Sequence, residues 1–127
     1  MIQNRPVNIN LLKIKLPLSA FLSITHRISG ILIFFIVLPF SVLTFSELTQ
    51  GQDSFDNFIN MYHANFIIKF GCIGLILIFQ YHIFAGIRHM LMDFHILNES
   101  LSSSYSSAVT TLILYLVNAL LTLWVML

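Results

Sequence analysis

Charged side chains are scarce in this chain: they make up 9% of its 127 residues, whereas 57% of the residues are hydrophobic. A typical soluble domain has about 25% charged residues. The mean hydropathy of +0.89 therefore predicts a protein that lies in a membrane. Since a spanning helix needs about 20 apolar residues, the chain has room for three of them and none for a separate soluble catalytic domain.

Two further scarcities exclude other classes of protein. Cys72 is the single cysteine, so a disulfide within the chain is impossible. The few basic residues form no run and do not alternate with aromatics, so nucleic acid is not an expected partner. No small-residue cleavage pattern follows the first apolar segment, and we expect that segment to be a retained helix and not a signal peptide.

Three long apolar segments predict an all-α membrane protein. The expected transmembrane helices cover about residues 19–46, 64–94 and 105–127. The polar stretch ELTQGQDSFDNFINMYH is read as a loop between the first two, and NESLSSSYSS as a serine-rich connection between the last two.

The chain is expected to form one membrane-anchor domain, residues 1–127, with a short N-terminal segment, residues 1–18. The first loop is acidic, whereas four basic residues precede or begin the first helix: Arg5, Lys13, Lys15 and Arg27. By the positive-inside rule this asymmetry predicts an N-terminus on the cytoplasmic or matrix side.

The second helix carries a polar stripe. At 100° per residue His82, Gly86, His89 and Asp93 share one face. His82 lies about 9 Å inside Arg88 along the helix axis, and Arg88 is expected to face head groups or a soluble partner. A histidine at that depth either hydrogen-bonds to another helix or ligates haem iron, with Gly86 letting a flat macrocycle approach the backbone.

A second axial ligand is missing at the expected depth of His82. That level corresponds to about residues 32–34 of the first helix and to Leu112 of the third, and neither place offers His, Met or Cys. His26 and His89 are expected to lie too near the surface. A six-coordinate haem would therefore be shared with a second membrane chain.

The stretch SITHRISG opens the first apolar segment. Ser23 and Arg27 are four residues apart and share a helix face, with His26 on an adjoining one. Arg27 either anchors the helix end at lipid head groups or joins Ser23 in binding a carbonyl or carboxylate oxygen. Asp93 either forms a surface pair with His89 or orients that imidazole and helps proton entry.

Two long motifs in this order resemble the signatures of one family. RPVNINLLKIKLPLSAFLSITHRIS and HIFAGIRHMLMD are similar to those of the cytochrome b subunits of succinate dehydrogenase. The resemblance covers Arg5 to Phe94, and the third helix fits by position and length. His95 departs from the family pattern, which usually has a small residue two places after the aspartate.

The resemblance implies a membrane anchor and haem b subunit of succinate:ubiquinone oxidoreductase, with no dehydrogenase active site of its own. Ser23 and Arg27 would bind ubiquinone, and His82 would be one axial ligand of haem b. His26, Arg27 and His89 would meet the haem propionates, and Asp93 would assist proton entry. The implied partners are a second hydrophobic anchor subunit that supplies the other axial ligand, an iron–sulfur subunit, a flavoprotein subunit and membrane lipid.

Three alternatives remain open at this point. One is a quinol:fumarate reductase anchor, which has the same architecture with the reverse reaction. Another is a structural anchor without a redox role, although such an anchor would need none of Ser23, Arg27 and His82. A transporter subunit with a histidine relay would need polar residues through the whole membrane depth, which the first and third helices lack. A bacterial inner membrane is the expected location, with the mitochondrial inner membrane as the alternative.

Overall fold

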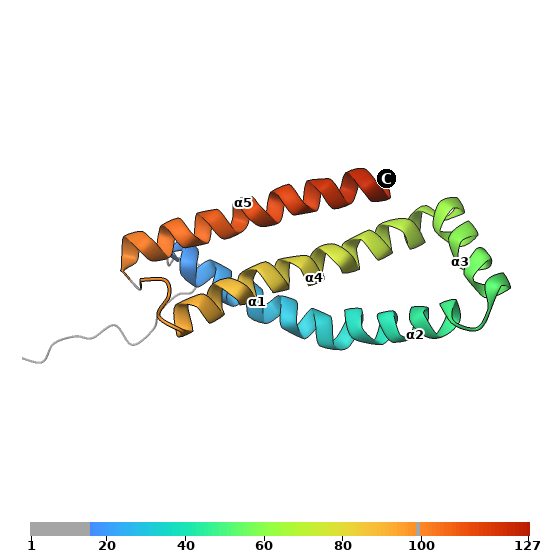
Figure 1. Ribbon diagram of the computed structural model, residues 1–127, viewed down its shortest axis with the longest axis horizontal. Coiled ribbons are helices and arrows are strands. Elements are labelled where there is room, and N and C mark those ends of the chain that lie inside the picture. Colours follow the sequence, from blue (N-terminus) through green and yellow to red (C-terminus); the bar gives the residue numbers. More distant parts are fainter. Residues whose placement is uncertain (1–15, 99) are drawn as a thin grey trace, which may run out of the picture.

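The computed structural model describes residues 16–98 and 100–127, and within them it contains helices and no strand. Long helices run side by side, and a short one closes one end of the bundle (Figure 1). In chain order the elements are α1 (Leu18–Leu32), the π-helical turn η1 (Ile33–Val37), α2 (Leu38–Leu48), α3 (Gln52–Ala64), α4 (Phe66–Asp93) and α5 (Leu101–Met126).

Three helical segments are long and apolar enough to cross a membrane, which confirms the predicted fold class. They cover Leu18–Leu48, Phe66–Asp93 and Leu101–Met126, with 31, 28 and 26 residues. The first comprises α1, η1 and α2 in one continuous helix. Arg5, Lys13 and Lys15, on which the predicted orientation depends, lie outside the described residues.

The first span contains Pro39 and forms a wide turn just before it. Proline cannot donate a backbone hydrogen bond and its ring crowds the preceding turn. The helix widens just before it, and the backbone N–H of Leu38 donates to the carbonyl of Ile33, five residues back. The span continues as α2 beyond the proline.

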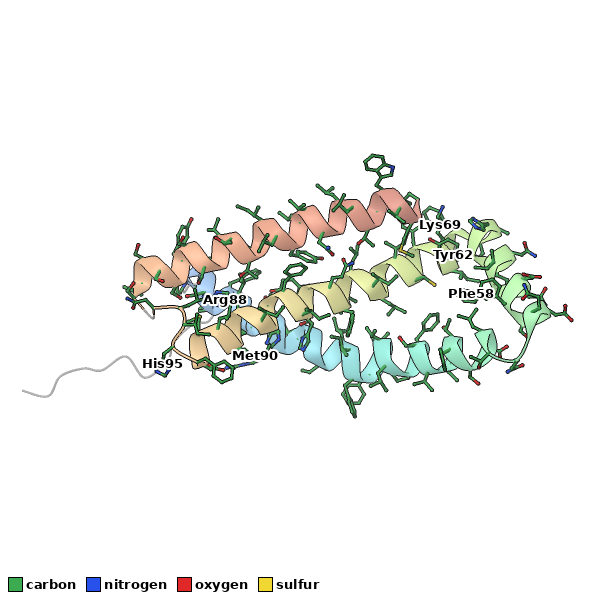
Figure 2. The ribbon with its side chains drawn as sticks, in the orientation of Figure 1. Phe58, Tyr62, Lys69, Arg88, Met90 and His95 are labelled. Carbon is green, nitrogen blue, oxygen red and sulfur yellow. The ribbon has the colours of Figure 1, made fainter. Side chains whose placement is uncertain are left out.

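The predicted first loop is wrong in part, because residues 52–64 form α3. Its charges and Gly51 suggested a loop, and Gly51 does make the turn with φ 152°. Phe55, Phe58, Ile59 and Tyr62, however, follow the spacing of an amphipathic helix. Figure 2 shows Phe58 and Tyr62 near Lys69 at the start of α4.

The serine-rich connection is shorter than predicted. Ser100 caps α5 by accepting a hydrogen bond from the backbone N–H of Ser103 at 3.2 Å, so the helix begins at Leu101, four residues before its expected start. Serine is a favoured N-cap because its hydroxyl satisfies a free backbone donor of the first turn. The serines that follow therefore lie on a helix face.

Small residues dominate the buried positions at which the helices touch. Ala85, Ala108, Ala119, Ser29, Ser104 and Thr111 are all buried. Such side chains let helices approach closely, which is how membrane helices gain packing energy. Most large apolar side chains point outward, where lipid or another membrane chain can cover them.

The backbone at the end of α4 explains why the family usually has a small residue at position 95. His95 has φ 57°, the left-handed conformation typical of the residue that follows a helix. The N–H of Ile96 donates to the carbonyl of Leu91 at 3.0 Å and closes the helix end. Glycine adopts this conformation without strain, which explains why a small residue fits here.

Candidate functional site

Three histidines meet at the end of the bundle where α1 begins and α4 ends. The rings of His26 and His82 are stacked with centroids 4.2 Å apart and an angle of 17° between their planes. The ring of His89 lies 5.0 Å from that of His26 and is tilted by 41°. Residues far apart in the sequence, all predicted for the site, thus form one cluster between α1 and α4.

A serine fixes the orientation of His82. Ser29 Oγ lies 2.9 Å from His82 Nδ1, and the same hydroxyl donates to the carbonyl of His26 at 2.7 Å. Because the serine proton is used in that second bond, the hydroxyl acts as acceptor toward His82, and Nδ1 carries the ring proton. Nε2 of His82 then keeps its lone pair, as a metal-ligating histidine requires.

The depth predicted for His82 relative to the first helix is wrong. The level was expected near residues 32–34, but Ser29 bonds to His82, and a Cβ added to Gly30 would lie 3.2 Å from His82 Cε1. His26, expected near the surface, is half-buried and stacked on His82. The cluster therefore lies nearer the start of α1 than the sequence indicated.

Gly86 was predicted to let a flat macrocycle approach the backbone, and within this chain the group next to it is the ring of His26. A Cβ at this position would lie 3.2 Å from His26 Nε2. That nitrogen is buried and has no hydrogen-bond partner among the described residues. A polar atom left without a partner is costly in a protein interior and is a natural contact for a bound group.

Ser23 and Arg27 have uncommitted polar groups. The hydroxyls of Thr25 and Ser29 donate hydrogen bonds to backbone carbonyls of α1. Ser23 is half-buried, and in the described part of the chain its hydroxyl makes no such bond. The exposed side chain of Arg27 likewise has no ion pair there. Both side chains are therefore available to a ligand.

Charge gathers around His89. Arg88 and Asp93 from α4 and Arg27 from α1 all lie close enough to His89 to act on its charge. Asp93 is exposed at the helix end. The predicted residues Arg27, His89 and Asp93 thus form the outer part of the site, and His26 and His82 form the inner part.

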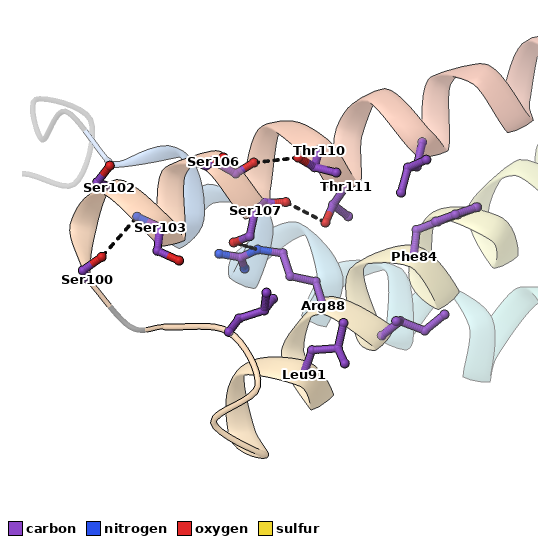
Figure 3. A pocket seen from close by; sticks show the side chains of 13 residues that line it. Phe84, Arg88, Leu91, Ser100, Ser102, Ser103, Ser106, Ser107, Thr110 and Thr111 are labelled. Atoms are coloured by element: carbon purple, nitrogen blue, oxygen red, sulfur yellow. Dashed lines mark hydrogen bonds between the residues drawn. The ribbon is translucent and has the colours of Figure 1, made fainter.

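Arg88 does not point where the sequence predicted. Its side chain is 3% exposed and lies between α4 and α5 (Figures 2 and 3). Nε donates to Ser107 Oγ at 3.1 Å, and Nη2 donates to the carbonyl of Ser104 at 3.1 Å. The expectation that Arg88 faces head groups or a soluble partner is wrong, because the serines of α5 form a helix face that receives it.

Two contacts between α1 and α4 were missed in the sequence. One is Ser29 with His82, and the other joins the hydroxyls of Thr25 and Tyr81. Thr25 and Ser29 are four residues apart, so they share a helix face. Two hydroxyl side chains at this spacing in an apolar helix could have indicated which face of α1 contacts α4.

The residues present fit a haem held jointly with another chain. Within residues 16–98 and 100–127 no three His, Cys, Asp or Glu side chains are grouped to hold a metal ion. A haem iron needs only one axial nitrogen from this chain. His82 Nε2 has the required lone pair, and His26 Nε2 is a buried polar atom without a partner.

Comparison with known proteins identifies the family. The family model for the succinate dehydrogenase/fumarate reductase transmembrane subunit matches residues 1–123. The chain belongs to this family. The family predicted from the two motifs is thereby confirmed, and the match extends into α5 as far as residue 123, where the motifs gave only position and length.

Named relatives of this transmembrane subunit include cytochrome b subunits. The succinate dehydrogenase cytochrome b556 subunit of Coxiella burnetii (strain RSA 493 / Nine Mile phase I) is 37% identical over 89 residues, 70% of each chain. The cytochrome b560 subunit of Reclinomonas americana is 34% identical over 94 residues, which cover 71% of this chain and 65% of that one. The b556 subunit of Rickettsia bellii (strain RML369-C) is 35% identical over 89 residues, covering 70% and 67%.

Proposed function

We propose that this protein is the membrane anchor and haem b subunit of a succinate:ubiquinone oxidoreductase. Family membership and the names of the relatives support a membrane anchor of succinate dehydrogenase. The observation that carries the redox role is the hydrogen bond of Ser29 to His82 Nδ1, which leaves Nε2 as a free ligand. A purely structural anchor would need neither this bond nor the histidine cluster.

His82 is the residue that would hold the haem iron. When bound, haem b supplies a one-electron carrier next to the quinone site. Ser29 holds the His82 ring in one orientation and one tautomer, which is the usual role of a hydrogen bond to the second nitrogen of a ligating histidine. Arg27, His26 and His89 would bind the propionates, because together they offer a guanidinium and imidazole N–H groups to carboxylates.

Ser23 and Arg27 would bind ubiquinone at the same end of the bundle. The Ser23 hydroxyl donates a hydrogen bond to a quinone carbonyl oxygen, and Arg27 stabilises the negative charge that develops there as electrons arrive. Asp93, exposed beside His89, would pass protons from the aqueous side. The polar groups of both residues have no hydrogen bond within the described part of the chain, which supports this role.

The proposed assembly has four kinds of subunit. A second hydrophobic anchor would supply the other haem ligand, since the neighbouring ring of His26 is stacked on that of His82. An iron–sulfur subunit delivers electrons, and a flavoprotein subunit oxidises succinate. We place the N-terminus on the cytoplasmic or matrix side of a bacterial inner membrane, with the mitochondrial inner membrane as the alternative.

The second candidate function is that of a quinol:fumarate reductase anchor. The matching family includes transmembrane subunits of both enzymes. The direction of the reaction depends on cofactor potentials that are set mainly in the soluble subunits. The three relatives named above are all succinate dehydrogenase subunits, which favours succinate oxidation.

The decisive experiment is a reduced-minus-oxidised visible spectrum of the complex purified through a tag on this chain. We expect a b-type haem signal that is lost or shifted in a His82→Ala variant. The matched control is His63→Ala, since His63 is exposed on α3 at the opposite end of the bundle. A normal spectrum in His82→Ala would remove the ligand role, and no haem in the unaltered complex would leave a quinone-binding anchor.

A further inference from the structure

A groove of about 540 Å³ lies between the end of α4 and the beginning of α5 (Figure 3). One part of its wall is polar and consists of Arg88 with the hydroxyl-bearing face of α5. The other part is apolar and includes Phe84, Ile87 and Leu114. The groove is separate from the histidine cluster, which lies between α1 and α4.

Arg88 brings a buried positive charge to this groove. Its hydrogen-bond partners are neutral: Ser107 Oγ at 3.1 Å, and the carbonyl and hydroxyl of Ser104 at 3.1 and 3.3 Å. Among residues 16–98 and 100–127 no carboxylate forms an ion pair with it. A guanidinium buried without a counter-charge is costly, so an anion in this groove would stabilise it.

The first turn of α5 adds to this positive potential. The helix is 26 residues long, begins at Leu101 beside the groove and has no acidic side chain in its first turn. Its free backbone N–H groups and the positive end of its dipole favour a negative group at this point. Arg88 and the helix start therefore attract an anion into the same groove.

The apolar wall indicates that this anion carries hydrocarbon. Ile87 is 45% exposed and Leu114 is 53% exposed, and both lie within membrane-spanning helices. A free inorganic anion would leave these side chains uncovered. A phospholipid would place its phosphate near Arg88 and lay acyl chains along Ile87 and Leu114.

We propose that the groove between α4 and α5 binds a phospholipid with an anionic head group, whose phosphate pairs with Arg88. This site holds the α4–α5 end of the bundle together and gives the subunit a preference for anionic lipid. It does not depend on the haem or quinone roles proposed above.

The test uses the whole complex, stripped of lipid in detergent and titrated with dioleoyl-phosphatidylglycerol. Retained lipid is counted by native mass spectrometry, with dioleoyl-phosphatidylcholine and inorganic phosphate as comparison ligands. Since a hydrogen bond to a charged group contributes about 1.5–3 kcal/mol, we expect Arg88→Gln to weaken phosphatidylglycerol binding at least about tenfold. Equal binding of both lipids, or equal displacement by inorganic phosphate, would overturn the proposal.

A second variant guards against misfolding of Arg88→Gln. Ser103→Asp puts a carboxylate in the first turn of α5, where it suits the helix dipole, and leaves the bonds of Arg88 to Ser104 and Ser107 intact. We expect weakened phosphatidylglycerol binding with unchanged thermal stability, whereas Ser46→Asp, an equal charge change at the exposed end of α2, should have no effect. Unchanged binding in Ser103→Asp would contradict the proposal.

Glu99 precedes the cap residue of α5 and lies outside the described residues, so its charge is tested directly. We expect Glu99→Gln to leave phosphatidylglycerol binding unchanged. A gain in binding of about tenfold or more in this variant would mean that Arg88 is neutralised within the chain, and the proposed lipid site would be abandoned.

Discussion

Ser29 Oγ lies 2.9 Å from Nδ1 of His82 and joins α1 to α4 at the centre of the histidine cluster. The serine proton goes to the carbonyl of His26, so the bond to His82 fixes the imidazole proton on Nδ1. One hydroxyl thereby sets both the tautomer and the ring orientation of the proposed haem ligand. Sequence reasoning had identified the histidine and missed the residue that positions it.

Ser29→Ala should alter the haem signal without removing the ligand. The His82 ring would lose its only hydrogen bond to the neighbouring helix and would be free to change tautomer or rotate. Loss of such a partner typically lowers metal affinity by about 10–100-fold. We expect less haem per complex, or a shifted reduced-minus-oxidised spectrum, while Thr25→Ser, which keeps a hydroxyl on the same face, should leave both unchanged. An unaltered spectrum in Ser29→Ala would show that the bond does not matter for the haem.

Ser23→Ala and Arg27→Ala should impair quinone reduction and spare succinate oxidation by an artificial acceptor. Removing a neutral hydrogen bond costs about 0.5–1.5 kcal/mol and removing a charged one about 1.5–3 kcal/mol. We therefore expect kcat/KM for ubiquinone to fall by up to about tenfold in Ser23→Ala and by about 10–100-fold in Arg27→Ala. Normal quinone kinetics in both variants would remove these residues from the site.

Gly86→Ala should disturb the stacked rings. The added Cβ would lie 3.2 Å from His26 Nε2, so the ring must shift by a few tenths of an ångström. We expect a changed haem spectrum and a free energy of unfolding about 1 kcal/mol or more below that of Gly74→Ala. Gly74→Ala is the control, because no atom lies within 4 Å of its new Cβ and alanine favours the helix by about 1 kcal/mol. Equal behaviour of the two variants would contradict the close approach at Gly86.

His95→Gly should stabilise the end of α4. His95 has φ 57°, a conformation that costs an ordinary residue about 1 kcal/mol. Glycine avoids this cost, although the replacement loses the interactions of the imidazole, which include the contact between His95 Nδ1 and the carbonyl of Asp93 at 3.1 Å. We expect a higher midpoint of thermal unfolding for His95→Gly and a lower one for His95→Val, measured on the detergent-solubilised complex. A lower midpoint for His95→Gly would mean that the imidazole contacts outweigh the backbone strain.

The three spans could be predicted because charge-free runs of this length have one common explanation. The polar face of α4 could also be predicted from the sequence, since His82, Gly86 and His89 repeat with the period of a helix. These patterns do not predict how far one helix is shifted relative to another along the axis of the bundle. That shift depends on side-chain packing between segments distant in sequence, such as Ser29 against His82.

The error in depth has a specific cause. The same number of residues was counted inward from Arg27 on α1 and from Arg88 on α4, but Ser29 lies against His82, so Arg27 lies deeper along the bundle than Arg88. Arg88 itself is buried against Ser104 and Ser107. An arginine in an apolar helix usually reaches the interface. Here hydroxyl groups of α5 replace water around Arg88. The sequence next to Arg88 contains no pattern that predicts these partners.

The wide turn at residues 33–37 has a consequence for how the first span varies in length. A π-turn holds one residue more than an α-turn, so the faces before and after it are offset by about 100°. Deleting one residue here would convert the turn to ordinary α-helix and leave the parts before and after it facing as they do now. The first span can therefore gain or lose a residue at this point while Ser23, His26 and Ser29 keep their positions against α4.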